Sequence, residues 1–547
     1  MPKRPHDESA RELPQKRARP TLAPDRLSAL SDELALHVLS FLPIRSLITC
    51  QRVSRRFYIL ASDSEIWKRK YYSRWILPRA RRVRQLTQLD AAIEPIGYSS
   101  KVVKWLEHGR SWREGREIDW MKEYRLQHNW SKGSCRVREL EVAQPPIPPV
   151  LVNLHNGVVF TVDARNGLRA WSMKDTEVML ASQSFDGFPS VAPTAVAISS
   201  NESSSKDQTV AVGFEDGSFE IYTLDYDTKR FKRRLSKSKH EDGEITALAS
   251  CPGYLLVLFQ NKKLSLYRLA SDSSLRLIDS LHASNIRAPL TLSVRIVGSG
   301  VIASIAYSFP RIGCGWCIGL QEVRWDEDGQ NLGSHLATPL DSQALSSPIG
   351  LGVTMRRSEN PVSALQRQQS SFPYPSYTQP PTALSYSHPY LLTAHSDNTL
   401  TTYLVVSTAE KLTISPPRRL WGHTSSISGV QVGGRGKAVS VSSRGDDIRV
   451  WELEGMVPSP LIAKAPRLRE RSIQLSPERM KSQSAPIGSK NAPNVLLEFG
   501  ASPRLTQKDT SSELTKMTGL VGFDDEQVVV LRERDLGTQL LDCYDFR

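Results

Sequence analysis

The chain has 547 residues, of which 71 are basic and 57 acidic, and its formal net charge is +14 at pH 7. This length allows several domains with sizeable cores, and no apolar run approaches the ~20 residues of a membrane helix. No charged and apolar leader opens the sequence, so secretion is not expected. Six cysteines are too few for a disulfide framework in a chain of this length, which indicates a reducing compartment. The positive charge is compatible with binding to nucleic acid, to acidic lipid or to an acidic or phosphorylated protein segment, and it does not distinguish among these partners.

Residues 1–26 combine five prolines with many charges, which predicts a disordered tail. Two basic clusters lie in this tail, with residues 5–15 between them. Their spacing resembles a bipartite nuclear import signal, in which an extended chain fits two acidic grooves at once. The signal residues would be Lys3, Arg4, Lys16, Arg17 and Arg19. A solvated basic tail is the alternative, so we expect the protein in the nucleus, the cytoplasm or both.

Residues 30–67 predict three short helices. In the first, Leu34, Val38 and Leu42 recur at intervals of four, with Leu39 beside them. Pro43 ends that helix and can open the next. In the second helix Leu47 and Ile48 are expected to point inward, and the third helix is expected to run through Val53, Phe57 and Leu60. Helices this short bury little by themselves, so part of their apolar surface is expected to meet a partner.

This segment closely resembles the F-box. The residues that carry the resemblance are Leu30, Asp32-Glu33, Leu42-Pro43, Leu47, Val53-Ser54-Arg55-Arg56-Phe57 and Trp67. Ser31 stands where the family usually has proline, and a serine can still cap the helix. The resemblance implies binding to the Skp adaptor, which bridges F-box proteins to a cullin scaffold. The residues expected at that contact are Leu30, Leu34, Val38, Leu42, Pro43, Leu47, Val53 and Trp67. An amphipathic helical hairpin of unrelated use is the alternative.

Residues 68–133 are rich in tryptophan and arginine, which favours a helical linker. The tryptophans are Trp75, Trp105, Trp112, Trp120 and Trp130, and the densest basic cluster is Arg79, Arg81, Arg82 and Arg84. Buried tryptophans with solvated arginine heads explain this composition more simply than nucleic-acid stacking does. The run Asn129-Trp130-x-x-Gly133 resembles the junction before the propeller in F-box/WD-repeat proteins. By that resemblance, Ser134–Val142 is the outer strand that closes the ring.

From Val150 onward, short apolar strands alternate with turns rich in Gly, Asn, Asp and Ser. Five strand–turn–strand units end in an aromatic residue, at Trp171, Tyr222, Tyr267, Tyr403 and Trp451. Val297–Trp325 and Leu520–Tyr544 fit more loosely and bring the number of units to seven. The shorter spacings between these aromatics match a four-stranded blade of about 40–45 residues. These units resemble worn WD repeats and predict an all-β propeller of about seven degenerate blades.

The markers of strong WD repeats are sparse. Only His423, in Trp421-Gly422-His423, completes a good Gly-His opening. The position six residues before Trp451, where a turn aspartate is usual, is Gly445. The polar network that rigidifies strong repeats is therefore expected to be mostly absent. The last strand, Gln539–Phe546, is expected to pair with Ser134–Val142 and latch the ring.

Two stretches rich in serine and proline, residues 338–382 and 457–515, are expected to be disordered insertions between blades. The chain carries four Ser-Pro pairs in these stretches, at Ser347-Pro348, Ser459-Pro460, Ser476-Pro477 and Ser502-Pro503. Each pair is a weak motif, and a proline-directed phosphorylation site and a plain flexible linker are equally good interpretations.

No catalytic motif stands in the sequence, and the eleven histidines form no ligand cluster. Cys314 and Cys317 have CxxC spacing, but no second pair lies nearby. We therefore expect two buried, reduced thiols, with no metal and no cofactor.

The predicted organisation is multidomain: a tail (1–26), a small all-α F-box (27–70), a helical linker (71–133) and a propeller (134–547). By resemblance, the function is that of a non-catalytic substrate-recognition subunit of an SCF-type cullin ubiquitin ligase. Its F-box would bind the Skp adaptor, and its propeller would bind a target protein whose identity the sequence does not give. The alternatives are an F-box scaffold in a nuclear assembly without a degradative role, and a nucleic-acid-associated factor, which is the less favoured.

Overall fold

The computed structural model describes residues 30–78, 118–143, 150–172, 179–185, 191–200, 207–239, 241–269, 274–282, 286–311, 315–339, 379–433, 436–443, 447–453, 472–477, 516–533 and 539–547. The chain divides into two compact units, each with its own core. The helical unit contains residues 30–78 and 118–124, and the propeller unit contains the described residues from Arg125 onward. The predicted nuclear signal (Lys3, Arg4, Lys16, Arg17 and Arg19) lies outside the described residues.

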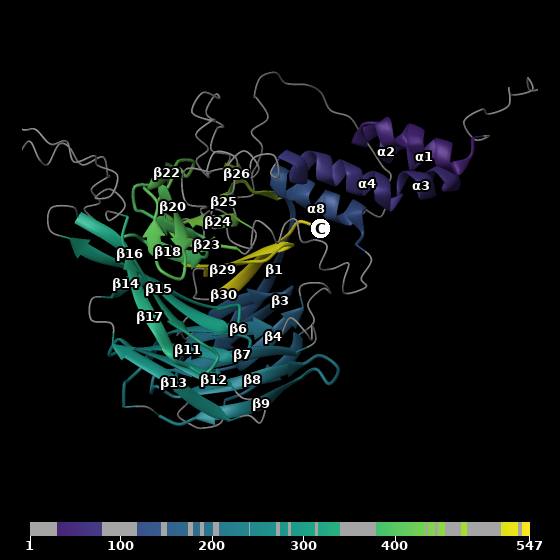
Figure 1. The fold of residues 1–547 in the computed structure, drawn as a ribbon. Coiled ribbons are helices and arrows are strands. Elements are labelled where there is room, and N and C mark those ends of the chain that lie inside the picture. The colour runs from purple at the N-terminus through teal and green to yellow at the C-terminus, as the bar shows by residue number, and fades with distance from the viewer. Residues whose placement is uncertain are drawn as a thin grey trace, which may run out of the picture. The chain divides into compact units, whose positions relative to one another are not determined.

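Short helices build the helical unit (Figure 1). They are α1 (Asp32–Phe41), α2 (Ile44–Cys50), α3 (Arg55–Ala61), α4 (Ser64–Tyr71), a π-helical turn (Tyr72–Ile76) and the beginning of α8 (Trp120–Lys132). Three of them begin at side-chain caps: the Ser54 hydroxyl accepts from the N–H of Phe57, the Asp63 carboxylate from the N–H of Glu65, and the Asp119 carboxylate from the N–H of Lys122. The unit closes over a core of Ala35, Leu39, Leu47, Leu60, Ala61 and Ile66.

Aromatic rings join α4 and its π-helical turn to the first turns of α8 within the helical unit. The Trp67 and Trp75 rings lie 5.4 and 4.6 Å from the Tyr124 ring, and the Tyr71 ring lies 5.5 Å from the Trp120 ring. The prediction that tryptophans of residues 68–133 are buried in the fold is confirmed for Trp120 and Trp130, whereas Trp75 is half-buried. Trp105, Trp112 and the arginines at 79, 81, 82 and 84 lie outside the described residues.

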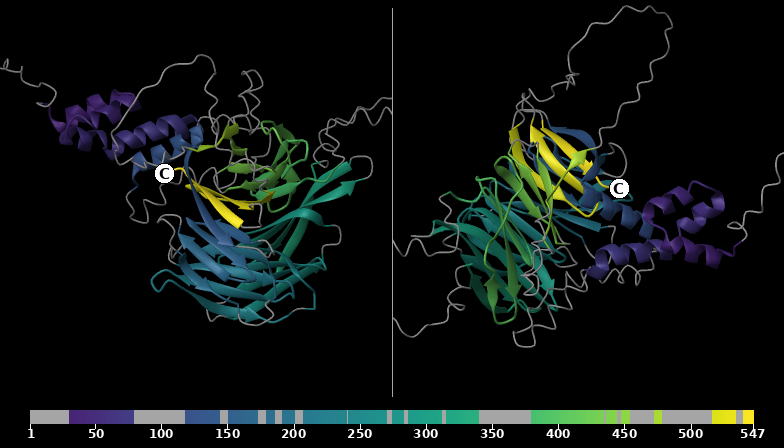
Figure 2. Two further views of the ribbon diagram at one scale, coloured as in Figure 1. Left: turned by 180° about the vertical axis from the view of Figure 1, so that it is seen from behind. Right: turned by 90° about the horizontal axis from the view of Figure 1, so that it is seen from above.

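Seven sheets of antiparallel strands make up the propeller unit, and their order follows the sequence (Figures 1 and 2). Blade 1 contains β2 (Leu151–His155), β3 (Val158–Asp163), β4 (Gly167–Ser172) and β5 (Met179–Gln183); blade 2 contains β6 (Pro193–Ser200), β7 (Asp207–Phe214), β8 (Phe219–Asp225) and β9 (Arg230–Lys237). Blade 3 contains β10 (Ile245–Cys251), β11 (Tyr254–Phe259), β12 (Lys263–Leu269) and β13 (Leu275–His282); blade 4 contains β14 (Arg287–Val297), β15 (Gly300–Arg311), β16 (Gly315–Trp325) and β17 (Asn331–Ala337).

The later blades complete the ring. Blade 5 contains β18 (Ala383–Ser387), β19 (Tyr390–Ala394), β20 (Leu400–Ser407), β21 (Leu412–Ile414) and β22 (Arg418–Leu420); blade 6 contains β23 (Ile427–Val432), β24 (Lys437–Ser442), β25 (Ile448–Glu452) and β26 (Ser472–Gln474). Blade 7 contains β28 (Lys516–Phe523), β29 (Gln527–Glu533), β30 (Gln539–Asp545) and β1 (Ser134–Ala143), and the two-residue β27 (Ser476–Pro477) pairs with β1. The prediction of a propeller with about seven blades is confirmed.

The ring is latched by the two ends of the propeller unit. Strand β1 pairs antiparallel with β30, from Arg136 opposite Asp545 to Ala143 opposite Gln539. In Figure 1, β1 accordingly lies beside the yellow C-terminal strands. The predicted closure is confirmed. Because β30 also pairs with β29, it is an interior strand of its blade. Its removal would leave both β1 and β29 without the strand that pairs with them.

The end of α8 is built into this latch. The indole of Trp130 stacks on the ring of Phe546, with centroids 3.8 Å apart and planes 9° from parallel. Its Nε1 donates to the carbonyl of Asp525 at 2.8 Å, and Asn129 Nδ2 donates to the carbonyl of Phe546 at 2.7 Å. The ammonium of Lys437 lies 4.6 Å from the Trp130 ring. The Asn-Trp junction motif therefore binds the C-terminus of the propeller.

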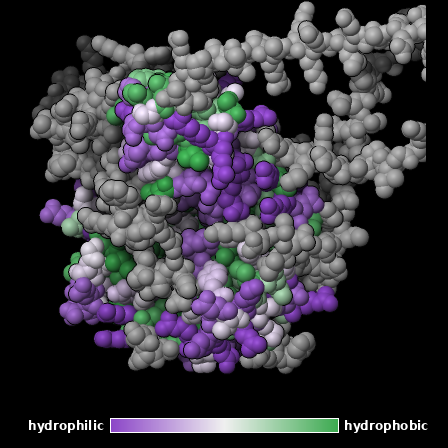
Figure 3. All heavy atoms as spheres, turned by 90° about the vertical axis from the view of Figure 1, so that its right-hand side faces the viewer, coloured by the Kyte–Doolittle hydropathy of each residue, from purple (hydrophilic) through white to green (hydrophobic). Residues whose placement is uncertain are grey.

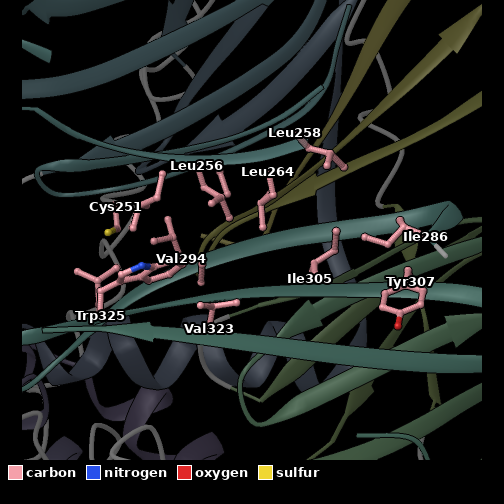
Figure 4. Packing of buried hydrophobic residues seen from close by; sticks show 14 residues of the cluster. Cys251, Leu256, Leu258, Leu264, Ile286, Val294, Ile305, Tyr307, Val323 and Trp325 are labelled. Atoms are coloured by element: carbon pink, nitrogen blue, oxygen red, sulfur yellow. The ribbon is translucent and has the colours of Figure 1, made fainter. Parts of the chain in front are cut away.

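Neighbouring blades are joined by apolar clusters that fill the space between their sheets. Figure 4 shows the cluster between blades 3 and 4, where Leu256 and Leu264 of one blade face Val294, Ile305 and Val323 of the next. Each such side chain stabilises the fold by about 1.5–3 kcal/mol when it is fully buried. Burial also raises the pKa of the Cys251 thiol in this cluster, and of Cys543 in blade 7, to about 12. Both thiols are therefore protonated and unreactive at neutral pH.

Two sequence predictions about this unit need correction. Residues 472–477, inside the predicted insertion 457–515, form β26 and β27, because Leu475 fills a buried site in the core between blades 6 and 7. Cys317 lies in β16 and is only half-buried, because it stands near the start of the strand. The rest of insertion 457–515, residues 340–378 of the other insertion, and Cys314 all lie outside the described residues. Of the four Ser-Pro pairs, the described part of the chain contains Ser476-Pro477.

Candidate functional site

The first helix turns one apolar face inward and another outward. Ala35 and Leu39 are buried, whereas Leu34, Val38 and Phe41 are 55%, 46% and 73% exposed. The inward face of Ala35 and Leu39 is one position away from the predicted stripe of Leu34, Val38 and Leu42. Leu34 and Val38 are therefore available to a partner, as their predicted role requires.

The following segments extend this exposed apolar surface. Ile48 on α2, Val53 in the turn before α3, and Tyr58 and Ile59 on α3 are each at least half exposed. Figure 3 shows that hydrophobic side chains reach the surface in separate patches among mainly hydrophilic ones. We call the exposed large apolar residues of α1 to α3 and the turns between them the apolar face; they are Leu34, Val38, Phe41, Ile48, Val53, Tyr58 and Ile59.

Two residues predicted to bind the adaptor are instead part of the core. Leu47 is fully buried between α1 and α3, and Trp67 is 3% exposed. The Trp67 indole donates a hydrogen bond to the carbonyl of Ala61 at 2.8 Å, which explains why a buried tryptophan is tolerated there. Both side chains hold the helices together and cannot touch a partner without unfolding the unit. The prediction for Ile48 is wrong in the opposite sense, because its side chain was expected to point inward and is half exposed.

The remaining predicted contact residues lie at helix ends. Leu30 and Leu42 are half-buried, and Pro43 is exposed at the N-cap of α2. Arg56 ties the start of the unit to α3, because its Nη2 donates to the Leu30 carbonyl at 2.5 Å and forms an ion pair with Asp32 at 2.7 Å. This pair is largely exposed and contributes little to stability. The Ser31 carbonyl accepts from the N–H of Ala35, but within the described residues its hydroxyl makes no capping bond.

Sequence reasoning missed Phe41, Tyr58 and Ile59 as members of the apolar face. Phe41 follows Leu34 and Val38 at helical spacing, so the same periodicity could have identified it. Tyr58 and Ile59 directly precede the buried Leu60 on a seven-residue helix. A helix of two turns has too few residues for periodicity to tell its inner from its outer face.

In the propeller unit, the aromatic blade markers all occupy the same structural position. They lie on the third strand of their blades, at Trp171, Tyr222, Tyr267, Tyr403 and Trp451, with Trp325 and Tyr544 in the two looser units. All but Trp171 are buried. They hold neighbouring strands and blades together, so they are structural residues and not a binding site.

Blade 6 contains a buried polar network that the sequence did not predict. His423 Nε2 lies 2.6 Å from Ser440 Oγ, which also accepts from the Trp451 indole at 2.8 Å. His423 Nδ1 lies 3.1 Å from a carboxylate oxygen of Asp447, which also accepts from Arg449 Nε. The carboxylate belongs to Asp447, four residues before Trp451, and not to the position six residues before it, which is Gly445. The prediction that the polar network is absent is therefore wrong for this blade.

The described residues contain no group of three or more His, Cys, Asp or Glu side chains that could hold a metal ion. Within the same residues, no helix is both long enough and apolar enough to cross a membrane.

Comparison with known proteins agrees with this architecture. Residues 29–73 match the F-box-like family, and residues 135–547 match the family described as F-box protein pof12 beta-propeller. F-box protein pof12 of Schizosaccharomyces pombe is 22% identical over 478 residues, which cover 82% of this chain and 90% of that protein. An F-box protein of Saccharomyces cerevisiae is 29% identical over 126 residues, so the match spans 21% of this chain and only 18% of that protein.

A short match to F-box protein dre-1 of Caenorhabditis elegans is 45% identical over 47 residues, which is 9% of this chain and 5% of that protein. Among solved structures, the WD40 propeller of Doa1 aligns with a TM-score of 0.35 and 11% identity, over 74% of this chain and 96% of that one. The family match to residues 135–547 spans well over half of the chain. The chain therefore belongs to the F-box protein pof12 beta-propeller family.

Proposed function

We propose that the chain is the substrate-recognition subunit of an SCF-type cullin ubiquitin ligase. The helical unit binds the Skp adaptor, and the propeller unit binds the protein to be modified. The observation that carries this proposal is the apolar face, which lies within residues that match the F-box-like family. F-box domains typically bind this adaptor, and exposed apolar side chains on short helices are what such docking needs.

The energetics of the apolar face suit a specific contact. Each leucine, valine, isoleucine or phenylalanine that is fully removed from water contributes about 1.5–3 kcal/mol. The seven side chains of the face can therefore offset the entropic and desolvation costs of association, even where their burial is incomplete.

The proposed role needs no chemistry from this chain. Holding a target beside a ubiquitin-loaded enzyme raises its effective concentration there, and the bond-forming steps are performed by the other subunits. We therefore propose a non-catalytic adaptor.

The proposal predicts which substitutions abolish assembly. Tagged wild-type protein purified from cells is expected to bring down the Skp adaptor and the cullin, whereas Leu34→Asp with Val38→Asp loses both. Both side chains are about half exposed, so the carboxylates disturb docking without disturbing the core. The matched control is Leu332→Asp with Leu336→Asp, two leucines on β17 that are at least as exposed, which should keep both partners. Adaptor recovery that is equal for the two double variants would refute the assignment of the docking face.

We further propose that the basic clusters of residues 1–26 direct nuclear import, because their spacing fits two acidic grooves at once. A fluorescent fusion with Lys16→Ala, Arg17→Ala and Arg19→Ala is expected to shift from nucleus to cytoplasm. A control that removes the same charge, Arg79→Ala, Arg81→Ala and Arg82→Ala, should keep the wild-type distribution. An unchanged nuclear fraction in the first variant would refute the import signal and favour the alternative, a solvated basic tail.

A further inference from the structure

The outer strand of blade 2 carries an unusual concentration of positive charge. We call residues 229–239, which include β9 (Arg230–Lys237), the β9 rim. Seven of these eleven residues are basic and none is acidic: Lys229, Arg230, Lys232, Arg233, Arg234, Lys237 and Lys239. The outer strands of blades 1, 4 and 6, as the structure describes them, contain no lysine, arginine, aspartate or glutamate. The outer strands of blades 3 and 7, β13 and β1, contain arginines together with acidic residues.

Most of this charge is not compensated within the fold. Arg233 forms a half-exposed ion pair with Glu220 at 3.4 Å, and Lys237 donates to the Tyr267 hydroxyl at 2.9 Å. Within the residues that the structure describes, Lys229, Arg230, Arg234 and Lys239 form no ion pair. Arg230 and Lys232 are exposed, while Phe231 between them is buried and fixes the strand to the blade.

The backbone of β9 is open along one side. It pairs with β8 from Asp225 opposite Arg230 to Phe219 opposite Lys237, and it is the last strand of its sheet. Within the described part of the chain no other strand pairs with it, so the outward N–H and C=O groups of β9 have no partner strand there. Lysine and arginine on such an edge discourage pairing with neutral or basic strands. The same charges favour a strand whose side chains are acidic.

We propose that the β9 rim binds an extended protein segment rich in glutamate and aspartate, which adds to blade 2 as a fifth strand. Main-chain hydrogen bonds to the open edge supply the geometry, and alternate acidic side chains meet the arginines and lysines. The inference rests on the proposed function, in that the segment would belong to the target that the propeller unit holds.

A peptide fits this edge better than a nucleic acid does. The exposed edge presents alternating donors and acceptors, and a second polypeptide backbone satisfies both kinds. Single-stranded nucleic acid binds through aromatic platforms beside basic residues. The aromatic residue of β9 is Phe231, and its ring is buried against blade 1.

The test is the fluorescence anisotropy of labelled probes titrated with the purified full-length protein at low salt. The acidic probe alternates Glu and Thr and is long enough to pair along the eight residues of β9. Its neutral counterpart has Gln for every Glu, and a third probe has Pro for every Thr. An oligothymidine of similar charge is the nucleic-acid probe. We expect saturable binding of the Glu–Thr probe alone, weakening steeply with added salt.

Matched variants locate the site. Arg230→Gln, Lys232→Gln and Arg234→Gln together should weaken binding of the Glu–Thr probe by at least about tenfold. The control removes equal charge from exposed arginines of blades 3 and 4, by Arg276→Gln, Arg287→Gln and Arg311→Gln, and should bind as the wild type does. Equal weakening in both variants, no binding to wild type, or equal binding of the Pro-containing probe would each overturn the added strand. Tighter binding of the oligothymidine through the same residues would make the rim a nucleic-acid site instead.

This outcome is separable from the docking of the helical unit. The β9-rim variant should still bring down the Skp adaptor, and the Leu34→Asp, Val38→Asp variant should still bind the Glu–Thr probe. Failure of the probe with intact adaptor binding rejects only the β9-rim inference.

Discussion

Deletion of residues 539–547 is expected to leave the chain without a folded propeller. These residues form β30, which pairs with β1 on one side and β29 on the other. The deletion removes five buried apolar side chains, Leu540, Leu541, Cys543, Tyr544 and Phe546, together with the ring on which Trp130 stacks. At about 1.5–3 kcal/mol for each large side chain, the loss is comparable to the whole stability of a typical domain, about 5–15 kcal/mol.

Thermal denaturation followed by circular dichroism measures this effect. The truncated protein should lack the cooperative loss of β-structure that the full chain shows. A control that lacks nine residues from the N-terminus, ahead of the helical unit, should melt at the wild-type temperature. Equal melting temperatures for the C-terminal truncation and the full chain would contradict the closure of the ring by β1 and β30.

Replacement of Glu322 is expected to be the most costly single substitution in the propeller unit. Its carboxylate is fully buried, and it accepts hydrogen bonds from Arg295 Nη2 at 3.0 Å, Ser407 Oγ at 2.5 Å and the Tyr386 hydroxyl at 3.1 Å. Arg324 Nη2 lies 3.6 Å from the same carboxylate. Two guanidinium groups of blade 4 thus share one carboxylate with polar groups of blade 5.

Glu322→Ala should therefore lower the free energy of unfolding by about 3–5 kcal/mol, because it leaves two largely buried cations without their counterion. Urea denaturation measures the loss, and the matched control is Glu410→Ala on an exposed turn of blade 5, expected within about 0.5 kcal/mol of wild type. Replacing all three charges, with Glu322→Leu, Arg295→Met and Arg324→Met, should restore much of the stability. Similar losses for Glu322→Ala and Glu410→Ala would show that the network contributes nothing.

The propeller was predictable because its signals are local and repeated. Each blade places an aromatic residue at the same point of its third strand, so Trp171 and Trp451 mark equivalent positions although they lie far apart in the chain. The Asn-Trp junction and the C-terminal strand were likewise predicted to meet, and the stacking of Trp130 on Phe546 is the contact that joins them.

The misassigned residues of the helical unit have a common cause. In α2, both Leu47 and Ile48 are apolar, and seven residues do not reveal that only Leu47 points inward. Trp67 belongs to the F-box pattern because it holds the core, and a family pattern alone does not separate structural residues from contact residues.

The polar networks around His423 and Glu322 could not be predicted from the sequence, for a different reason. Asp447 reaches His423 from a turn position that repeat spacing does not specify. The partners of Glu322 come from five strands between residues 295 and 407, so no local pattern relates them. Charge density, by contrast, is visible in sequence, but only the sheet order shows that β9 is an open edge.

The central claim is that the apolar face of the helical unit docks onto the Skp adaptor. Isothermal titration of the purified full-length protein with the purified adaptor tests it most directly. Wild type is expected to bind saturably with one-to-one stoichiometry, and Leu34→Asp with Val38→Asp is expected to weaken binding at least about 100-fold, which is a loss of about 2.8 kcal/mol. Absence of binding by the folded wild type, or equal affinity for the variant, would contradict the account.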